Sequence, residues 1–238
     1  MTDNNERRLY LIPSMLGESF VSQVLPAGNL EIMNSLRHFV VEEEKTARRF
    51  LIHCGFKNNL DLVRFYTLNE HTRDKDIPAM FSDSGDADIG LISEAGVPAV
   101  ADPGAKLVEA AMKMNIRVIP LVGPSSIILA LMASGLNGQC FAFNGYLPVK
   151  SQLRNNRIRF YEKRSGAERQ SQIFIEAPYR NNQLVEAFLE NCRPDTRLCI
   201  ASNLTLNGEW IKTKTVREWQ IHRPPDLRHK PAVFILIG

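Results

Sequence analysis

Ile89-Gly-Leu-Ile-Ser-Glu-Ala-Gly-Val-Pro-Ala-Val-Ala-Asp-Pro-Gly104 is the most informative segment of this 238-residue sequence. Its apolar start, residues 89–93, predicts a buried strand, and the Gly, Pro and Ala residues that follow predict a loop. Apolar residues then recur at helical spacing over 104–114, and the apolar run 116–122 predicts another strand. Strand, loop, helix and strand in this order are typical of a parallel α/β sheet.

The residues before this segment repeat the same alternation. Strands are expected at 9–13 and 62–66, with a further apolar run at 39–41, and helices are expected from about residue 29 and over 44–54. Gly55 is expected to end the second helix because glycine readily adopts the left-handed conformation found after helix C-termini. The first half of the chain is therefore expected to form a mainly parallel sheet.

The residues after it differ in character. A tight loop and a buried helix are expected over 122–133. Further strands are expected at 141–146, 173–176, 197–202 and 232–237, and helices at 151–164 and 181–191. The change of pattern falls between Pro120 and Pro124. We therefore expect two domains, residues 1–121 and 122–238.

Composition excludes several classes of protein. Hydrophobic residues make up 44% and charged residues 23%, which is typical of a globular chain and not of a disordered, collagen-like or coiled-coil one. The four cysteines lack metal-ligand spacing, so we expect no metal. Residues 1–8 are polar and Gly123 and Pro124 interrupt the longest apolar stretch, so we expect no signal peptide, no membrane span and a cytoplasmic location.

Positive charge is concentrated in two segments although the net charge is only +3. Residues 149–169 contain seven Lys or Arg against two Glu, and a second basic stretch runs from Lys212 to Lys230. Such segments bind phosphates or form ordinary solvated surfaces, and the sequence leaves both interpretations open.

Small residues cluster after three of the expected strands, at 13–17, 93–104 and 122–126. Ligands of open α/β sheets bind beyond the carboxyl ends of the strands, and small residues let backbone groups approach a ligand closely. Ser125 or Ser126 has an alternative role as the N-cap of the next helix. The P-loop, G-x-G-x-x-G, H-E-x-x-H and G-x-S-x-G patterns are absent, so the ligand must be held in another way.

Several of these motifs together resemble a known family. They are the segment 88–104, Val118-Ile-Pro-Leu-Val-Gly-Pro-Ser-Ser126, Gly145-Tyr-Leu-Pro148, Glu176-Ala-Pro-Tyr-Arg180 and the end of the chain, 230–238. In order and spacing they resemble the tetrapyrrole methylase superfamily, and in particular its ribosomal RNA small subunit methyltransferase I branch. The resemblance implies two α/β domains, the second with a mixed sheet, and S-adenosylmethionine bound in the cleft between them. It also implies a homodimer that methylates a cytidine ribose 2'-oxygen of 16S rRNA, as free rRNA or in the 30S subunit.

The resemblance also implies which residues bind the cofactor. Leu204 and Val233 would sandwich the adenine, and Glu94 would face the ammonium group or the ribose hydroxyls, although a loop-capping role for Glu94 stays open. The full set is Pro13, Leu16, Gly17, Glu94, Gly96, Val97, Ser125, Ser126, Ile127, Ala177, Leu204, Ala232 and Val233.

Glu43 is the candidate catalytic residue because it aligns with an acidic run of the family, and a carboxylate can orient or deprotonate a ribose hydroxyl. The alternative is a surface salt bridge from Glu43 to Lys45 or Arg48. Tyr146 or Tyr179 would stack on a base, with core packing as the alternative for Tyr146. The candidate RNA-binding residues are Arg48, Arg49, Tyr146, Lys150, Arg154 and Arg157.

Three segments depart from the family pattern. The first loop reads Pro13-Ser-Met-Leu-Gly-Glu18 in place of T-P-I-G-N, Glu42-Glu-Glu-Lys45 replaces E-D-T-R, and Asn203-Leu-Thr-Leu206 replaces E-L-T-K. Two alternatives to an rRNA methyltransferase therefore stay open. One is a methyltransferase for a tetrapyrrole or other small metabolite, which the missing P-G-D of the first loop disfavours. The other is a cofactor-binding homologue without catalysis, suggested by the charges lost at Asn203 and Leu206.

Overall fold

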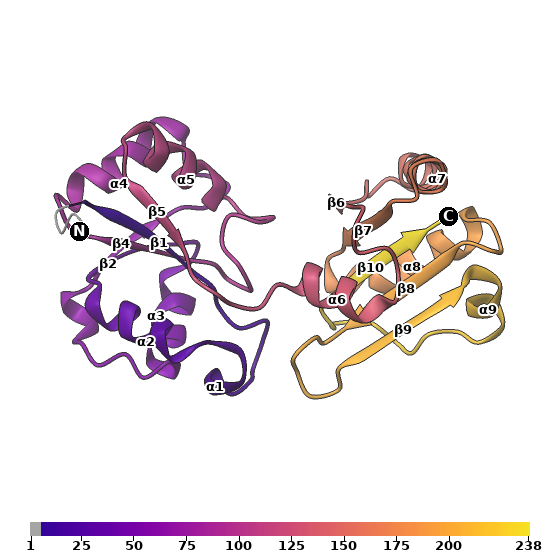
Figure 1. Cartoon of the computed structure of the whole chain (residues 1–238), viewed down its shortest axis with the longest axis horizontal. Helices are drawn as coiled ribbons and strands as arrows, with labels where there is room; N and C mark the ends of the chain where they lie inside the picture. Colours follow the sequence, from indigo (N-terminus) through magenta and orange to yellow (C-terminus); the bar gives the residue numbers. More distant parts are fainter. Residues whose placement is uncertain (1–5) are drawn as a thin grey trace. The chain divides into compact units, whose positions relative to one another are not determined.

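The computed structural model describes residues 6–238, which form two compact units that divide after Ser125 (Figure 1). Each unit contains one five-stranded sheet with its own hydrophobic core. The sequence places the division after residue 121, and the units of the structure divide after residue 125.

The sheet of the first unit is entirely parallel, with strand order β3-β2-β4-β1-β5. Its strands are β1 (Arg8–Ile12), β2 (His38–Val41), β3 (Arg64–Thr67), β4 (Ile89–Ile92) and β5 (Arg117–Pro120). Every residue of the central strand β4 is buried, as expected for a strand covered on both faces. Because all five strands point the same way, the loops that follow them lie along one edge.

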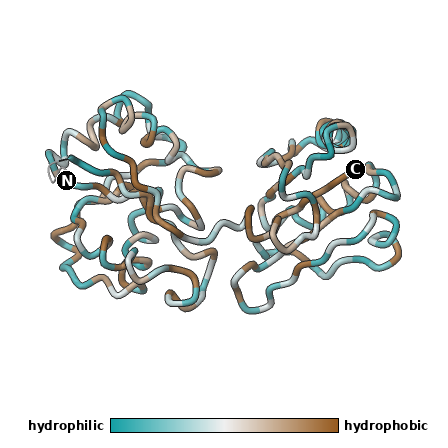
Figure 2. Tube along the Cα trace, in the orientation of Figure 1, coloured by the Kyte–Doolittle hydropathy of each residue, from teal (hydrophilic) through white to brown (hydrophobic). Residues whose placement is uncertain are grey.

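Helices cover both faces of this sheet (Figure 1). On one face lie α2 (Ala27–Ser35) and α3 (Glu44–His53), and on the other lie α4 (Ile77–Asp83) and α5 (Gly104–Lys113). A short helix α1 (Val21–Val24) precedes α2. The apolar strands run between these two helical layers in the hydropathy view (Figure 2). Gly55 has a φ of 72° directly after α3 and its C-cap residue, which confirms its predicted role in ending the helix.

The strand predicted at 62–66 is wrong in its bounds. Residues Leu60–Leu62 form a 3-10 helix, η1, because the side chain of Asn59 accepts a hydrogen bond from the backbone N–H of Asp61 and starts a turn there. Strand β3 begins only at Arg64. A second 3-10 helix, η2 (Asp74–Asp76), leads into α4, which the sequence did not predict.

The second unit has a mixed sheet, as the resemblance implied, with strand order β6-β7-β10-β8-β9. Strands β6 (Phe141–Tyr146) and β7 (Ser171–Ile175) are parallel. The other neighbours are antiparallel: β8 (Arg197–Ser202), β9 (Trp210–Thr215) and β10 (Ala232–Ile237). The helices are α6 (Ser126–Ser134), α7 (Ser151–Glu168), α8 (Asn181–Asn191) and α9 (Val216–Ile221), and a 3-10 helix, η3 (Pro178–Arg180), precedes α8.

The basic stretch from Lys212 onward is therefore not a separate surface segment, because its first part is the edge strand β9. Trp219 of α9 is buried and donates its indole N–H to the carbonyl of Leu198, 2.8 Å away, which joins this end of the chain to the core. No helix within residues 6–238 is both long and apolar enough to cross a membrane.

Candidate functional site

Three turns meet at the carboxyl edge of the parallel sheet, after β1, β4 and β5. The N–H of Ser14 donates to the carbonyl of Gly96 at 2.9 Å, and the hydroxyl of Ser93 donates to the same carbonyl at 2.6 Å. The side-chain amide of Asn29 donates to the carbonyl of Val122 at 2.8 Å, which joins the third turn to α2. The turns that contain Pro13, Gly96 and Ser125 are thus held by the first unit itself.

Glycine is required at two places where these turns touch. At Gly123 a Cβ would lie 2.2 Å from Cγ of Pro13, so no side chain fits between the first and third turns. At Gly96 φ is 77°, and a Cβ would lie 3.1 Å from Cδ2 of Leu16 and 3.2 Å from the carbonyl oxygen of Pro124. The expected cofactor residues Pro13, Leu16 and Gly96 therefore lie in direct proximity.

Asp102 fixes the loop between β4 and α5. One of its carboxylate oxygens accepts hydrogen bonds from the N–H groups of Ala99 and Gly104, each 2.8 Å away. Ala99 and Ala101 have φ values of 64° and 63°, which is a strained conformation for residues with a Cβ. The bonds to Asp102 hold this strained loop in place.

An open, acidic hollow of about 670 Å³ lies at the same edge, beyond β2, β3 and β4. Five of its lining residues are acidic, namely Glu42, Glu43, Glu70, Glu94 and Asp102, and no Lys or Arg of the described chain lines it. Burial raises the pKa of Glu42, and the charges of Asp102 and Glu94 raise it further. Burial and the charge of Glu43 raise the pKa of Glu94, and burial raises that of Asp102. The hollow is thus a strongly negative environment suited to a cationic group.

Glu43, the candidate catalytic residue, lies in this hollow and precedes the first residue of α3. Its carboxylate accepts a hydrogen bond from the hydroxyl of Thr46 at 2.8 Å. Arg48 pairs instead with Glu44, at 2.8 Å, and its guanidinium lies 4.8 Å from the ring centre of Phe65. The alternative salt bridge from Glu43 to Arg48 is therefore not formed, and Glu43 remains a candidate base.

Glu42 and Asp102 were not among the residues selected from the sequence. Asp102 carries a local signal, since Asp before Pro-Gly at a helix start is typical of a residue whose side chain bonds free backbone N–H groups. Glu42 directly follows β2, and only the parallel pairing of β2 with β4 brings it beside Glu94.

Four of the expected cofactor residues of the second unit share one edge of their sheet, whereas Ser126 and Ile127 begin helix α6. The register pairs Val233 with Ile175 of β7 and Ala232 with Ser202 of β8. Ala177 and Leu204 follow these two strands, so they lie at the end of the sheet where β10 begins. Leu204, Ala232 and Val233 are buried.

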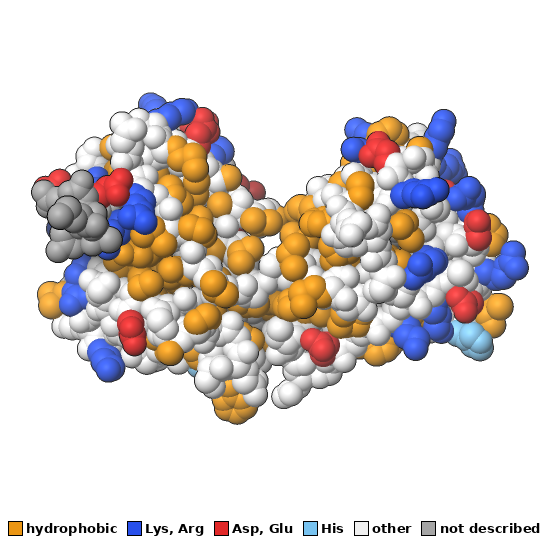
Figure 3. All heavy atoms as spheres, in the orientation of Figure 1, with side chains coloured by type: hydrophobic (Ala, Val, Ile, Leu, Met, Phe, Trp, Pro, Cys, Tyr) orange, Lys and Arg blue, Asp and Glu red, His pale blue; other side chains and the backbone are white. Residues whose placement is uncertain are grey.

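The candidate RNA-binding residues of this unit lie at the end of β6 and on α7. Tyr146 is 59% exposed after a bulge in β6, so it does not pack in the core. Lys150 and Arg157 are exposed, whereas Arg154 is buried. Lys and Arg side chains gather over the α7 side of this unit (Figure 3). In the first unit Arg49 is exposed on α3.

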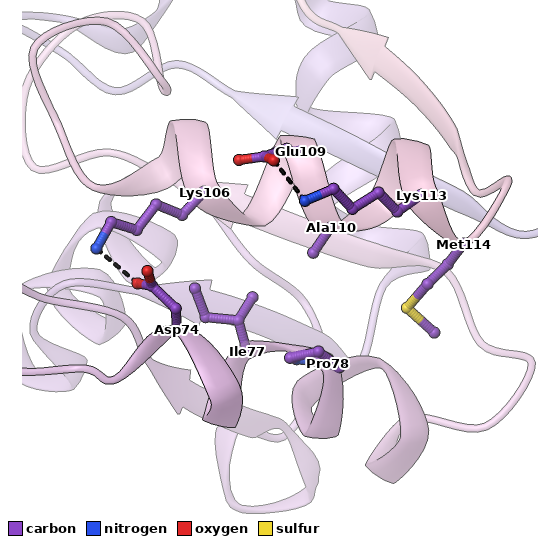
Figure 4. A pocket seen from close by; sticks show the side chains of 8 residues that line it. All are labelled: Asp74, Ile77, Pro78, Lys106, Glu109, Ala110, Lys113 and Met114. Carbon is purple, nitrogen blue, oxygen red and sulfur yellow. Dashed lines mark hydrogen bonds and ion pairs between the residues drawn. The ribbon is translucent and has the colours of Figure 1, made fainter.

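A second hollow, of about 300 Å³, lies between α4 and α5 (Figure 4). Ion pairs occupy its rim: Lys106 with Asp74 at 2.7 Å and Lys113 with Glu109 at 2.5 Å. It contains none of the expected site residues, and we assign it no role. No group of three or more His, Cys, Asp or Glu within residues 6–238 is arranged to hold a metal ion.

Comparison with solved structures identifies the fold. The chain matches the methyltransferase CobJ with a TM-score of 0.63 at 12% identity, covering 99% of this chain and 95% of that one. It matches uroporphyrin-III-C-methyltransferase from Thermus thermophilus with a TM-score of 0.56 at 16% identity, covering 97% and 94%. Structural similarity at 12% and 16% sequence identity identifies the fold and nothing more. The chain therefore has the two-domain α/β fold of the tetrapyrrole methylase superfamily.

Comparison with curated sequences gives the family. Proteins named ribosomal RNA small subunit methyltransferase I match from Xylella fastidiosa at 34% identity over 89% of this chain and 78% of that protein, and from Mesorhizobium japonicum at 30% over 98% and 76%. The Escherichia coli O157:H7 protein of the same name is 27% identical over 99% of this chain and 78% of its own length. No protein-family model matches the chain. The chain belongs to the ribosomal RNA small subunit methyltransferase I family.

Proposed function

We propose that this chain is an S-adenosylmethionine-dependent methyltransferase that methylates the ribose 2'-oxygen of a cytidine in small-subunit rRNA. The observation that carries the proposal is the meeting of three small-residue turns beside an acidic hollow, in a chain with this family membership.

The residues present fit the cofactor. The methyl donor has a cationic sulfonium and an ammonium group, and Glu42, Glu43 and Glu94 provide negative charge with no Lys or Arg lining the hollow. The turns at Gly96 and Gly123 leave room for backbone groups and not for side chains. Pro13, Leu16, Gly17, Glu94, Gly96, Val97 and Ser125 of the first unit would hold the cofactor, together with Ser126, Ile127, Ala177, Leu204, Ala232 and Val233 of the second.

The cofactor supplies an electrophilic methyl group, so the chain's own task is to position the acceptor and handle its proton. Glu43 would accept or orient the proton of the ribose hydroxyl. Its hydrogen bond from Thr46 fixes the carboxylate while leaving it within the hollow. No covalent protein nucleophile is needed.

The basic side chains of the second unit support an RNA substrate over a small metabolite. Lys150 and Arg157 are exposed, and Arg157 lies 5.7 Å from the ring centre of Phe160. Exposed Tyr146 and Tyr179 offer aromatic faces to bases. Binding through such groups weakens steeply with salt.

The test is incubation of the purified protein with labelled S-adenosylmethionine and unmodified 30S subunits, followed by nucleoside mass spectrometry. A 2'-O-methylated cytidine that forms only with the protein supports the proposal. Glu43→Gln should lower the rate at saturating cofactor about 10²-fold or more, a loss larger than any weakening of cofactor binding measured by calorimetry. Glu31→Gln is the matched control, because Glu31 is exposed on α2 and does not line the hollow. Tight cofactor binding without transfer to rRNA would overturn the proposed reaction.

A further inference from the structure

Helix α7 begins with unsatisfied positive charge. Its N-cap residue Lys150 makes no side-chain capping bond, and its first turn contains no acidic residue. The first N–H groups of any helix lack intrahelical partners, and they carry the positive end of the helix dipole. By itself this is an ordinary helix terminus, and a second feature distinguishes it.

That second feature is Arg154, at the fourth position of the helix. Only 6% of Arg154 is exposed, and its buried Nε has no hydrogen-bond partner among the described residues. Because helical side chains generally lean toward the N-terminus, we place the guanidinium over the first turn. Burying a cation without a partner is costly, so such a group favours binding of an anion.

The buried carboxylates of this unit have other partners. Glu176 accepts a hydrogen bond from Nε of Arg180 at 3.0 Å. Glu162, on the buried face of α7, accepts bonds from Thr196 and from the N–H of Arg193. Among residues 6–238, Arg154 therefore has no carboxylate partner to neutralise it.

We propose that the start of α7 is a phosphate-binding subsite, formed by the free N–H groups of its first turn, the guanidinium of Arg154 and the ammonium of Lys150. Its occupant is a backbone phosphate of the RNA substrate. Tyr146 ends β6 four residues before Lys150, so a nucleotide whose phosphate is held here is close to an exposed aromatic ring. The claim that the bound phosphate belongs to RNA rests on the proposed function. The claim that the subsite binds a phosphate group does not.

The first test uses inorganic phosphate and the full chain. At matched ionic strength, phosphate should raise the melting temperature of the wild type above its value in chloride, because a ligand of the folded state stabilises it. Arg154→Gln should abolish this difference without lowering the melting temperature in chloride, since it removes a buried unpaired charge. Lys163→Gln removes the same charge from an exposed position of α7 and should keep the response to phosphate.

Two results would overturn the subsite. One is a wild type that melts at the same temperature in phosphate and chloride. The other is an Arg154→Gln variant that loses several degrees in chloride, which would mean that Arg154 has a structural role.

The second test uses an rRNA fragment. Arg154→Gln should weaken binding about 10-fold and reduce the slope of log affinity against log salt by about 1. If rRNA is not methylated but phosphate still stabilises the wild type through Arg154, the subsite stands and the proposed substrate fails. If Arg154→Gln binds and methylates rRNA like the wild type, the RNA subsite fails and the proposed function stands.

Discussion

Single residues at the carboxyl edge of the parallel sheet combine strain with charge. Ala99 and Ala101 have positive φ values held by Asp102, and Glu42 and Glu94 have raised pKa values. Strained backbone and perturbed carboxylates are concentrated at functional sites in proteins. Glu94 could be selected from the sequence because it lies in a motif. Glu42 could be recognised as a site residue only from the pairing of β2 with β4.

Gly96→Ala should destabilise the protein by about 1–3 kcal/mol, because a Cβ is strained at this φ and meets Leu16 and Pro124. It should also weaken S-adenosylmethionine binding by about 10-fold or more. Urea unfolding and calorimetry measure the two effects. Gly28→Ala is the control, because Gly28 lies in α2, where an added methyl group would meet no atom within 4 Å. The free energy of unfolding of this variant should rise by up to about 1 kcal/mol. Unchanged stability and affinity in Gly96→Ala would contradict the described contact of the turns.

Glu42→Gln should stabilise the protein at pH 7 by about 0.5 kcal/mol. The raised pKa means that the folded state binds more protons than the unfolded state above the ordinary value of 4.5. Stability from this group is therefore present at low pH and lost as pH rises through the raised pKa. Unfolding measured from pH 4 to pH 8 should show the advantage of the variant growing with pH. Glu31→Gln, an exposed carboxylate of α2, should change stability by less than about 0.5 kcal/mol. An advantage that is constant over pH would refute the burial of charge at Glu42.

Helices and strands in which apolar residues recur at regular spacing could be predicted from the sequence, and those at the edges of the units could not. Strand β4 and helix α5 follow directly from the segment 89–114. Strand β9 was missed because Lys212 and Lys214 gave it the composition of a basic surface stretch, although lysines are common on edge strands. Helices α4 and α9 have only 7 and 6 residues, so their apolar positions cannot repeat over several turns.

Helix α9 depends on its N-terminal cap. The hydroxyl of Thr215 accepts a hydrogen bond from the N–H of Glu218, and the Glu218 carboxylate accepts one from the N–H of Thr215. Thr215→Ala should cost about 1 kcal/mol in urea unfolding at pH 7, whereas Thr215→Ser should keep most of the stability. The bonds to Thr215 lower the pKa of Glu218. The stability that the ionised Glu218 carboxylate contributes is therefore lost as pH falls below the ordinary value of 4.5. Equal stability of the Ala and Ser variants would contradict this role of the cap.

At the scale of the whole molecule, the expected cofactor residues are divided between two units that have separate cores. Neither unit carries the complete set, since Glu94 and Gly96 belong to the first and Leu204 and Ala232 to the second. The family resemblance selected these positions, because their distance in sequence leaves no local pattern that links them. Within each unit the strand register explains why they share one edge.

Hydrogen exchange of the full chain tests this division. If both units contribute contacts, S-adenosylmethionine should slow exchange in peptides that cover 13–17 and 94–97 and also in peptides that cover 203–206 and 231–233. The reason is that a ligand lowers the population of every local opening that breaks its contacts. Peptides from the hollow between α4 and α5 provide an internal control and should exchange at unchanged rates. Protection confined to one unit would mean that this unit binds the cofactor alone, and would remove the residues of the other unit from the site.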